Sequence, residues 1–209
     1  MKFGTIVADP PWAYSNASKN EKLSGYVTQD GNTIYTTLTT QDICDLPIGE
    51  HASDDSVLML WATWPFIPDA LKVIDSWGFD YVTAIPMVKV DSKEEPKYGV
   101  GYWFRGCSEV VLIGKRKGGK SYRSNFLGII TPSMTHSRKP EHLYEVGETY
   151  PGPRLEVFAR GDKAFSHGWY TLGNEAYLDG NDIKDTEKWE DTWEIQSLAG
   201  LGIRDALPA

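Results

Sequence analysis

The sequence has little cysteine, no long apolar run and no excess of positive charge. The two cysteines, Cys44 and Cys107, lie far apart and form no CxxC pair. Their number and spacing argue against a disulfide framework and a cysteine-based zinc site, and they favour a reducing compartment. The N-terminal apolar run is too short for a signal peptide, and no stretch approaches the length of a membrane span. We therefore expect a cytoplasmic protein with no membrane partner.

Several catalytic signatures are missing as well. No serine or cysteine stands in the pattern of an activated nucleophile. The glycines of "KGGK", residues 117–120, lack the rest of a phosphate-binding loop. The four histidines have no metal-ligand spacing such as HExxH, so we expect no metal; they are His51, His136, His142 and His167.

The negative charge is concentrated near the C-terminus. The net charge is −8, and residues 175–194 contain eight acids and two bases, which leaves −2 for the rest of the chain. Bases gather instead in "KRKGGKSYR", which begins with Lys115, Arg116 and Lys117. A solvated loop is the ordinary interpretation of such a run. The alternative, which we carry forward, is that these three residues contact nucleic-acid phosphates.

Length and composition indicate one globular domain, or one domain with an appendage. The chain has 209 residues, of which 41% are hydrophobic and 24% are charged. We expect a domain over residues 1–175, with an inserted active-site loop near 15–33, and an acidic appendage over residues 176–209. The polar, glycine-containing composition of residues 15–33 is typical of a long loop.

Segments that resemble strands alternate with segments that resemble helices. Buried strands are predicted at 3–10, 56–64, 80–90, 107–117 and 154–160, and shorter ones at 127–133 and 168–175. Helices are predicted at 39–48, 65–79 and 137–150, the last with Ser137 as its cap. The second is amphipathic, and its apolar face contains Phe66, Ala70, Leu71, Ile74 and Trp77. This alternation predicts an α/β fold with an open, largely parallel sheet. Such sheets bind ligands beyond the carboxyl ends of their strands, which makes Asp9, after the first strand, a site candidate.

The residues that follow the first strand are Asp9, Pro10, Pro11 and Trp12, the DPPW motif. One interpretation is a rigid exit from a strand, with a tryptophan that covers the core. A chemical interpretation is an amine clamp, in which the Asp9 carboxylate and the Pro10 carbonyl accept two hydrogen bonds from one planar NH2 group. Trp12 would then offer a flat face to the base that carries the amine.

With its neighbouring motifs, this stretch resembles the MT-A70-like adenine N6-methyltransferases. The resemblance includes "YTTLTTQDI", "VLMLWAT", "GYWFRGCSEVVLIGKRKG", "HSRKPEHLYE", "PGPRLEVFARG" and "GWYTLGNE", in the family's order, over roughly residues 5–175. It implies a Rossmann-like class I methyltransferase fold in permuted order, with the catalytic strand before the cofactor-binding strand. It also implies S-adenosylmethionine as the methyl donor and S-adenosylhomocysteine as the product.

The resemblance assigns roles to individual residues. It implies that the DPPW motif is catalytic and that Tyr35 lies near the active-site loop and the substrate. Lys139 matches a lysine that reaches the methionine carboxylate of the cofactor, and Asp9 would also face the cofactor. Further cofactor contacts are implied for Arg160, Asn174 and Glu175, the last two at the ribose hydroxyls. The alternative interpretation of Lys139 is a surface lysine at a helix start, that of Asn174 is a turn residue, and that of Glu175 is the first acid of the C-terminal segment.

Three functions remain open at this point. The first is methyl transfer to the exocyclic amine of adenine in DNA, in a bacterial or phage setting that is itself inferred by analogy. The second is the same reaction on RNA or on a free adenine nucleotide. The third is a non-catalytic nucleic-acid-binding member of the fold, which the intact DPPW motif disfavours. The sequence leaves open whether the protein is a monomer or a homodimer.

Overall fold

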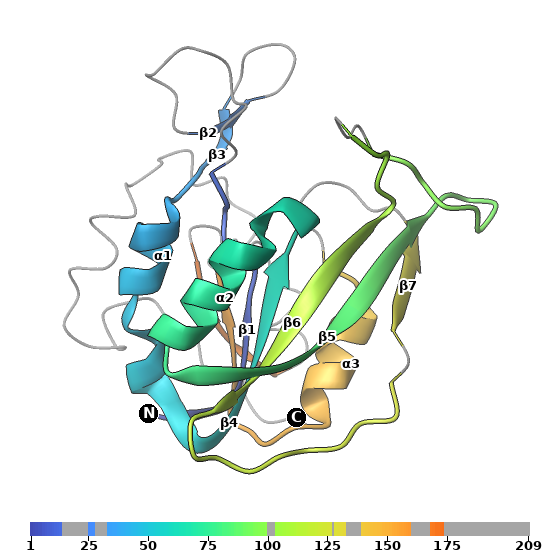
Figure 1. Ribbon diagram of the computed structural model, residues 1–209. Coiled ribbons are helices and arrows are strands. Elements are labelled where there is room, and N and C mark those ends of the chain that lie inside the picture. Colours follow the sequence, from blue (N-terminus) through green and yellow to red (C-terminus); the bar gives the residue numbers. More distant parts are fainter. Residues whose placement is uncertain are drawn as a thin grey trace.

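A seven-stranded sheet forms the centre of the protein (Figure 1). The computed structural model describes residues 1–13, 25–27, 33–99, 103–126, 128–132, 139–159 and 168–173, with the backbone alone for 25–27, 33–36 and 132. The sheet has the order β7-β5-β6-β4-β1-β8-β9. Its strands are β1 (Phe3–Ala8), β4 (Ala52–Ala62), β5 (Phe79–Val90), β6 (Ser108–Arg116), β7 (Ile129–Pro132), β8 (Arg154–Val157) and β9 (Tyr170–Leu172).

All strands of this sheet run parallel except β6, which is antiparallel to both β4 and β5. Strand β1 lies between β4 and β8. The chain leaves β1 toward β4 and leaves β8 toward β9, so the connections diverge between β1 and β8. Ligands in open α/β sheets bind at such a switch point, at the carboxyl ends of the strands. The fold is Rossmann-like, and the strand that carries the DPPW motif comes first in the chain, as predicted.

Helices cover both faces of the sheet (Figure 1). The helix α1 (Thr40–Asp45), the 3-10 turns η1 (Pro47–His51) and η2 (Trp64–Phe66), and the helix α2 (Ile67–Ser76) lie on one face. The helix α3 (Glu141–Glu148) lies on the other. Among the described residues, no helix has both the length and the apolar character needed to cross a membrane.

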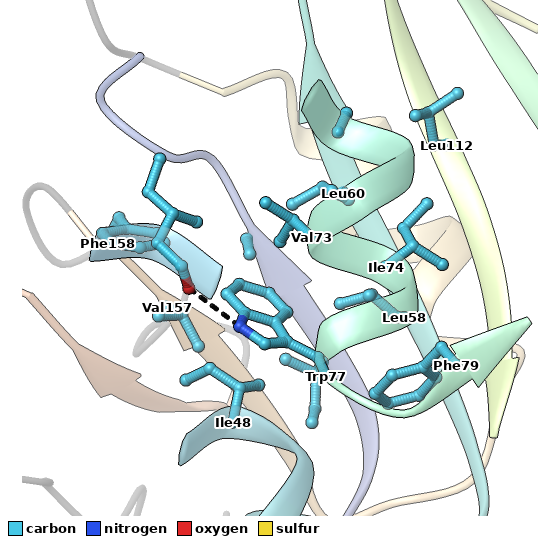
Figure 2. Close-up of a cluster of buried hydrophobic side chains, with 14 of the residues drawn as sticks. Ile48, Leu58, Leu60, Val73, Ile74, Trp77, Phe79, Leu112, Val157 and Phe158 are labelled. Atoms are coloured by element: carbon cyan, nitrogen blue, oxygen red, sulfur yellow. Dashed lines mark hydrogen bonds between the residues drawn. The ribbon is translucent and has the colours of Figure 1, made fainter. Parts of the chain in front are cut away.

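The side chains of the central strands alternate between the two covered faces. In β4, Leu58 and Leu60 face α2, whereas Val57 and Met59 face α3. Period-two alternation of two apolar sets is typical of a sheet that is buried on both sides. Figure 2 shows the α2 side, where the fully buried Trp77 packs among aliphatic side chains and donates from Nε1 to the Ile43 carbonyl at 2.9 Å.

The helix α1 begins where its sequence indicates. Thr39 is the N-cap, and its hydroxyl accepts a hydrogen bond from the backbone N–H of Asp42. The Asp42 carboxylate accepts in return from the backbone N–H of Thr39 at 2.9 Å. This capping box satisfies N–H groups at the helix start that otherwise lack a partner.

Two expectations about local structure need correction. Residues 15–33 are not an unstructured loop throughout, because β2 (Gly25–Val27) pairs antiparallel with β3 (Thr33–Thr36). Leu71, expected on the buried face of α2, is instead partly exposed, and Val73 takes the buried position. The expected acidic appendage, residues 176–209, and the expected helix cap Ser137 lie outside the described residues.

Candidate active site

The DPPW motif follows β1 directly and is held by backbone hydrogen bonds. The Pro10 carbonyl accepts from the Trp12 N–H at 2.9 Å, and the Pro11 carbonyl accepts from the Leu38 N–H at 2.9 Å. A bond between residues two apart closes a tight turn, and proline at its centre fixes the backbone dihedral φ. A carbonyl oxygen has two lone pairs, so Pro10 keeps one for an amine. The motif is therefore a rigid platform beside Asp9.

Trp12 is an anchor of this platform rather than an open surface for a base. Its side chain is only 5% exposed, and its ring stacks on Phe66 with the centroids 5.3 Å apart. Its Nε1 donates to the Trp61 carbonyl at 3.2 Å, at the end of β4. The expected role of Trp12 as a stacking partner for the substrate base is therefore not what this packing supports. The ring joins the end of β1 to β4 and η2.

Asp9 stands next to a buried ammonium group. Lys139 comes just before α3, and its Nζ lies 3.4 Å from Asp9 Oδ2. The side chain of Lys139 is 4% exposed, whereas that of Asp9 is 30% exposed. The two residues are 130 positions apart in the sequence, and the fold brings them together at the carboxyl edge of the sheet. One side of the Asp9 carboxylate thus faces Lys139, and the partly exposed remainder is open to a ligand.

A second carboxylate lies behind the first. Glu156, in the middle of β8, is 3% exposed, and its Oε1 lies 3.0 Å from Lys139 Nζ. Its other oxygen, Oε2, accepts a hydrogen bond at 3.0 Å from the hydroxyl of Tyr144 on α3. The four side chains form a continuous polar chain, Tyr144–Glu156–Lys139–Asp9, on the α3 side of the sheet. We call it the buried polar chain.

Burial and neighbouring charges shift the pKa values of three side chains in the buried polar chain. Burial raises the pKa of the Asp9 carboxyl, and Lys139 lowers it by less, so the pKa lies above its ordinary value. Burial alone would lower the pKa of Lys139, but the carboxylates of Glu156 and Asp9 together outweigh it and the pKa is raised. Burial, with Glu156 nearby, also raises the pKa of Tyr144. At neutral pH the lysine is therefore charged and the tyrosine hydroxyl is a hydrogen-bond donor.

A separate carboxylate flanks Asp9 from β6. Glu109 accepts a hydrogen bond from Trp61 Nε1 at 2.8 Å and forms an ion pair with Lys89 at 2.5 Å. Its negative charge also raises the pKa of Asp9. Glu109 on β6 and Glu156 on β8 thus both act electrostatically on Asp9.

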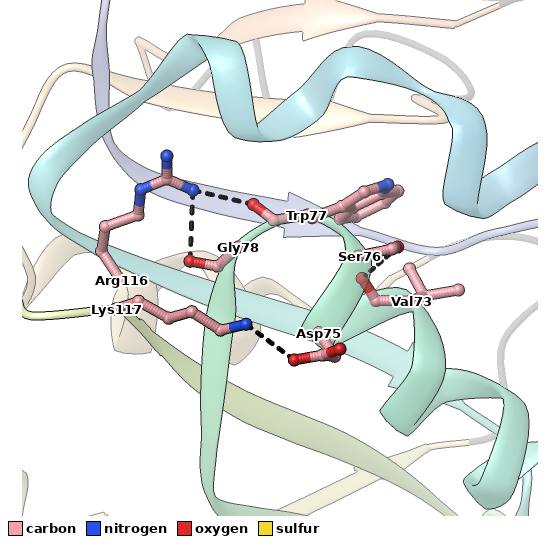
Figure 3. Close-up of polar contacts among 7 residues, drawn as sticks. All are labelled: Val73, Asp75, Ser76, Trp77, Gly78, Arg116 and Lys117. Carbon is pink, nitrogen blue, oxygen red and sulfur yellow. Dashed lines mark hydrogen bonds and ion pairs between the residues drawn. The ribbon is translucent and has the colours of Figure 1, made fainter.

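The basic cluster, which was expected to contact nucleic-acid phosphates, lies away from Asp9. Arg116 pairs with Phe79, the first residue of β5, and Lys115 pairs with Asp80 beside it, whereas Asp9 follows the carboxyl end of β1. The two bases therefore lie toward the amino ends of the parallel strands, away from Asp9. Arg116 Nη1 donates to the Trp77 and Gly78 carbonyls at 2.8 and 3.2 Å, and Lys117 pairs with Asp75 at 2.7 Å (Figure 3). These bases complete the C-terminal end of α2. The bases do not lie beside Asp9 because β6 runs antiparallel to β4 and β5.

The structure leaves several expected site residues without a described position. Tyr35 lies in β3, where its backbone pairs with Tyr26, and its side chain is not described. Arg160, Asn174 and Glu175 lie outside the described residues. Within the described segments, no group of three or more His, Cys, Asp or Glu side chains is placed to hold a metal ion.

Sequence reasoning missed Glu156, Tyr144 and Glu109. Glu156 had a usable signal, because it interrupts the apolar run "LEVF" in a strand of a sheet that is covered on both faces. A carboxylate there must be paired, and a paired buried charge at the ligand-binding edge is a site candidate. Tyr144 and Glu109 had no comparable signal.

The sequence is similar to one family of methyltransferases over nearly all of the residues that the structure describes. The MT-A70 family model matches residues 3–175. The N6-methyladenosine RNA methyltransferase MTA1 of Cryphonectria parasitica is 31% identical over 183 residues, which are 83% of this chain and 51% of that protein. The type II methyltransferase M.MunI of Mycoplasma sp. is 26% identical, over 83% of this chain and 78% of that protein.

A third relative is much longer than this chain. The human N(6)-adenosine-methyltransferase catalytic subunit METTL3 is 28% identical over 192 residues, which are 89% of this chain and 30% of that protein. The chain thus spans about half of the fungal relative and less than a third of the human one. The matched region contains the DPPW motif and the whole of the buried polar chain. This protein belongs to the MT-A70 family.

Proposed function

We propose that this protein transfers the methyl group of S-adenosylmethionine to the exocyclic amine of adenine in DNA. The observation that supports the proposal most directly is that two acceptors are adjacent in the chain: the partly exposed Asp9 carboxylate and the Pro10 carbonyl on a rigid turn. A planar NH2 group has two hydrogens, and these two acceptors match them. Hydrogen bonds to both hydrogens favour the more tetrahedral nitrogen that attacks a methyl carbon.

The donor set of the site fits the cofactor that the family implies. The methionine end of S-adenosylmethionine carries a carboxylate and an ammonium group. Lys139 has three N–H donors, of which Glu156 and Asp9 take two, so one remains for a carboxylate. When bound, the cofactor supplies an electrophilic methyl group on a sulfonium. Arg160, Asn174 and Glu175 are proposed as further contacts, on the resemblance alone.

The residues of the chain have separate tasks in this reaction. Asp9 and Pro10 orient the amine so that its lone pair points at the methyl carbon, since alignment contributes more here than a strong base. Bound S-adenosylmethionine would supply the methyl group and its sulfur would keep the electron pair of the carbon–sulfur bond, so the methylated nitrogen would have a proton to lose. The raised pKa of Asp9 makes its carboxylate a better acceptor for that proton than an ordinary surface aspartate. No metal has a part in the proposal.

DNA is the proposed acceptor because, of the three relatives described above, the type II methyltransferase is the one whose length this chain covers most fully. RNA is the second candidate, because MTA1 is an RNA methyltransferase and shares 31% identity. A base in a duplex must leave the stack to reach a pocket at the edge of a sheet. The partner is therefore a nucleic acid, and oligomeric state has no part in the proposal.

The test is methyl transfer from cofactor with a labelled methyl group. Plasmid DNA and an RNA transcript of the same sequence are incubated separately with the protein, hydrolysed, and the labelled nucleoside is identified. We expect N6-methyldeoxyadenosine from DNA and none with the Asp9→Asn variant. Label in RNA alone would replace the first candidate with the second. Label in neither acceptor would contradict the proposal.

A further inference from the structure

The buried polar chain continues past the two residues that the proposed reaction uses. Lys139 lies closer to Glu156, at 3.0 Å, than to Asp9, at 3.4 Å. Glu156 is almost fully buried, so its carboxylate has almost no surface to offer a ligand. We propose that Glu156 is a positioning residue for methyl transfer: its carboxylate holds the Lys139 ammonium beside Asp9, and Lys139 in turn fixes the Asp9 carboxylate for the amine. The inference rests on the proposed function.

Stability alone does not explain a buried carboxylate at this position. Charges that leave water carry a large desolvation penalty, and a buried ion pair is often no more stabilising than well-packed apolar side chains of similar size. Leu155 and Val157, on either side of Glu156, show that β8 supplies apolar side chains to the core. The Glu156 carboxylate is also fixed from its far side by the Tyr144 hydroxyl at 3.0 Å. Its two oxygens therefore have separate partners, and its orientation is set before any ligand arrives.

Charge counting shows what Glu156 contributes. Asp9 and Glu156 are acids and Lys139 is a base, so the three together carry one net negative charge when all are ionised. Without the charge of Glu156, Asp9 is the remaining carboxylate within 4 Å of the ammonium among the described residues. The ammonium is then drawn onto Asp9, where it competes with the substrate amine for the same oxygens. Glu156 thus takes part of the interaction with the Lys139 ammonium and leaves the Asp9 oxygens available to the substrate amine.

The Glu156→Gln variant tests this, because glutamine keeps the size and one oxygen but removes the charge. We expect kcat to fall by about 10–100-fold, the range expected when a reacting group is displaced by about 1 Å. Removing a negative charge also eases ionisation of Asp9 and disfavours the charged form of Lys139. Both the acidic and the basic limb of the pH–rate profile should therefore move to lower pH. A variant that is merely less well folded would show a lower rate at every pH, with both limbs of the pH–rate profile at their wild-type positions.

The other charged groups around Asp9 stay the same in this comparison. Glu109 from β6 also acts on Asp9, and it remains paired with Lys89. Tyr144 from α3 keeps a hydrogen-bonding partner, since the glutamine amide can donate to its oxygen. The shift of the profile can therefore be assigned to the lost charge of residue 156.

A second readout needs neither cofactor nor turnover. The side-chain carboxyl carbon of Asp9, assigned with the Asp9→Asn variant, is followed by carbon-13 NMR as a function of pH in the protein alone. We expect its titration midpoint to be lower in Glu156→Gln than in the wild type. Glu145→Gln is the matched control, because Glu145 lies exposed on α3 and makes its contact with His142. That control should leave the Asp9 midpoint and the pH–rate profile unchanged.

Glu156→Asp keeps the charge and covers the case in which Glu156→Gln does not fold. We expect it to retain an Asp9 midpoint near that of the wild type, with more activity than Glu156→Gln. An active wild type whose Asp9 midpoint and pH profile are unaffected by Glu156→Gln overturns the inference and leaves the proposed function intact. A wild type that methylates neither DNA nor RNA overturns the proposed function, and the Asp9 midpoint then still decides whether the charge of Glu156 reaches Asp9.

Discussion

The indole ring of Trp12 lies nearly parallel to the ring of Phe66, with 19° between their planes and 5.3 Å between their centroids. This contact joins the last residue of the DPPW motif to η2, just before α2. Together with the hydrogen bond to the Trp61 carbonyl, it fixes the motif to two elements of the fold. A tryptophan has a structural task here, which is to hold Asp9 and Pro10 in place.

Replacing Trp12 with alanine should therefore lower the free energy of unfolding strongly. Removing a large buried aromatic side chain typically costs about 3–5 kcal/mol, and the Trp61 carbonyl also loses a donor. Urea denaturation followed by circular dichroism measures the change. Trp64→Ala is the matched control, because Trp64 is 53% exposed and should cost about 1 kcal/mol or less. Equal losses for the two variants would contradict the anchoring role of Trp12.

The sequence predicts the sheet well because its strands carry a strong local signal. Buried parallel strands contain short β-branched and aliphatic runs, and their carboxyl ends are where ligands bind. Asp9 is therefore identified by its position after such a run. The pairing of Asp9 with Lys139 has no local signal, since it depends on which strands are neighbours. Only the resemblance to a family brought Lys139 forward.

Strand direction is the property that local patterns do not encode. The basic cluster lies at the end of β6, and in an all-parallel sheet it would lie at the same edge as Asp9. Because β6 runs antiparallel to β4 and β5, the cluster lies at the opposite edge. The hairpin of β2 and β3 was missed for a related reason, since short polar strands carry little hydrophobic periodicity.

Arg116 should matter for stability and not for binding of nucleic acid. Its guanidinium donates to two carbonyls at the end of α2 and lies over the Phe79 ring at 5.5 Å. Arg116→Leu should lower the free energy of unfolding by about 1–3 kcal/mol, because these acceptors lose a charged donor. The affinity for DNA, measured by filter binding at several salt concentrations, should keep its salt dependence.

Lys117→Ala is the control for Arg116→Leu, because it removes a charge at the same edge. Its ion pair with Asp75 is exposed, and exposed pairs contribute about 1 kcal/mol or less. We expect near wild-type stability and an unchanged salt dependence. A clearly flatter salt dependence in either variant would restore the basic cluster as a phosphate contact.

Gly147 on α3 should not tolerate a larger side chain. A Cβ atom there would lie 2.4 and 2.8 Å from two ring carbons of the buried Trp169. Gly147→Ala should therefore destabilise the protein by about 1–3 kcal/mol, although alanine favours a helix more than glycine does. Thermal unfolding measures the loss, with Gly106→Ala as the control, since nothing lies within 4 Å of a Cβ at Gly106. Similar melting temperatures for both variants would show that α3 can move away from Trp169.

The last prediction concerns the stability of the protein with and without the Asp9 carboxylate. The pKa of Asp9 is raised in the folded protein, so folding favours the protonated form. The wild type therefore loses stability as the pH rises from the ordinary value of 3.8 through the raised pKa. Asn cannot ionise, and Lys139 keeps its contact with Glu156 at 3.0 Å. The melting temperature of Asp9→Asn should accordingly exceed that of the wild type by a margin that grows with pH and then levels off.

The matching substitution, Asp55→Asn, should change the stability of the protein in the opposite direction. A hydrogen bond from Lys120 lowers the pKa of Asp55, so its carboxylate adds stability above the ordinary value that is lost as the pH falls through the lowered pKa. Scanning calorimetry of both variants between about pH 4 and pH 8 should show, at pH 7, a more stable Asp9→Asn and a slightly less stable Asp55→Asn. An Asp9→Asn variant that becomes less stable than the wild type as the pH rises would mean that the Asp9 carboxylate stabilises the fold. The expected result instead describes a carboxylate that lowers the stability of the fold, as the proposed role of Asp9 in methyl transfer would explain.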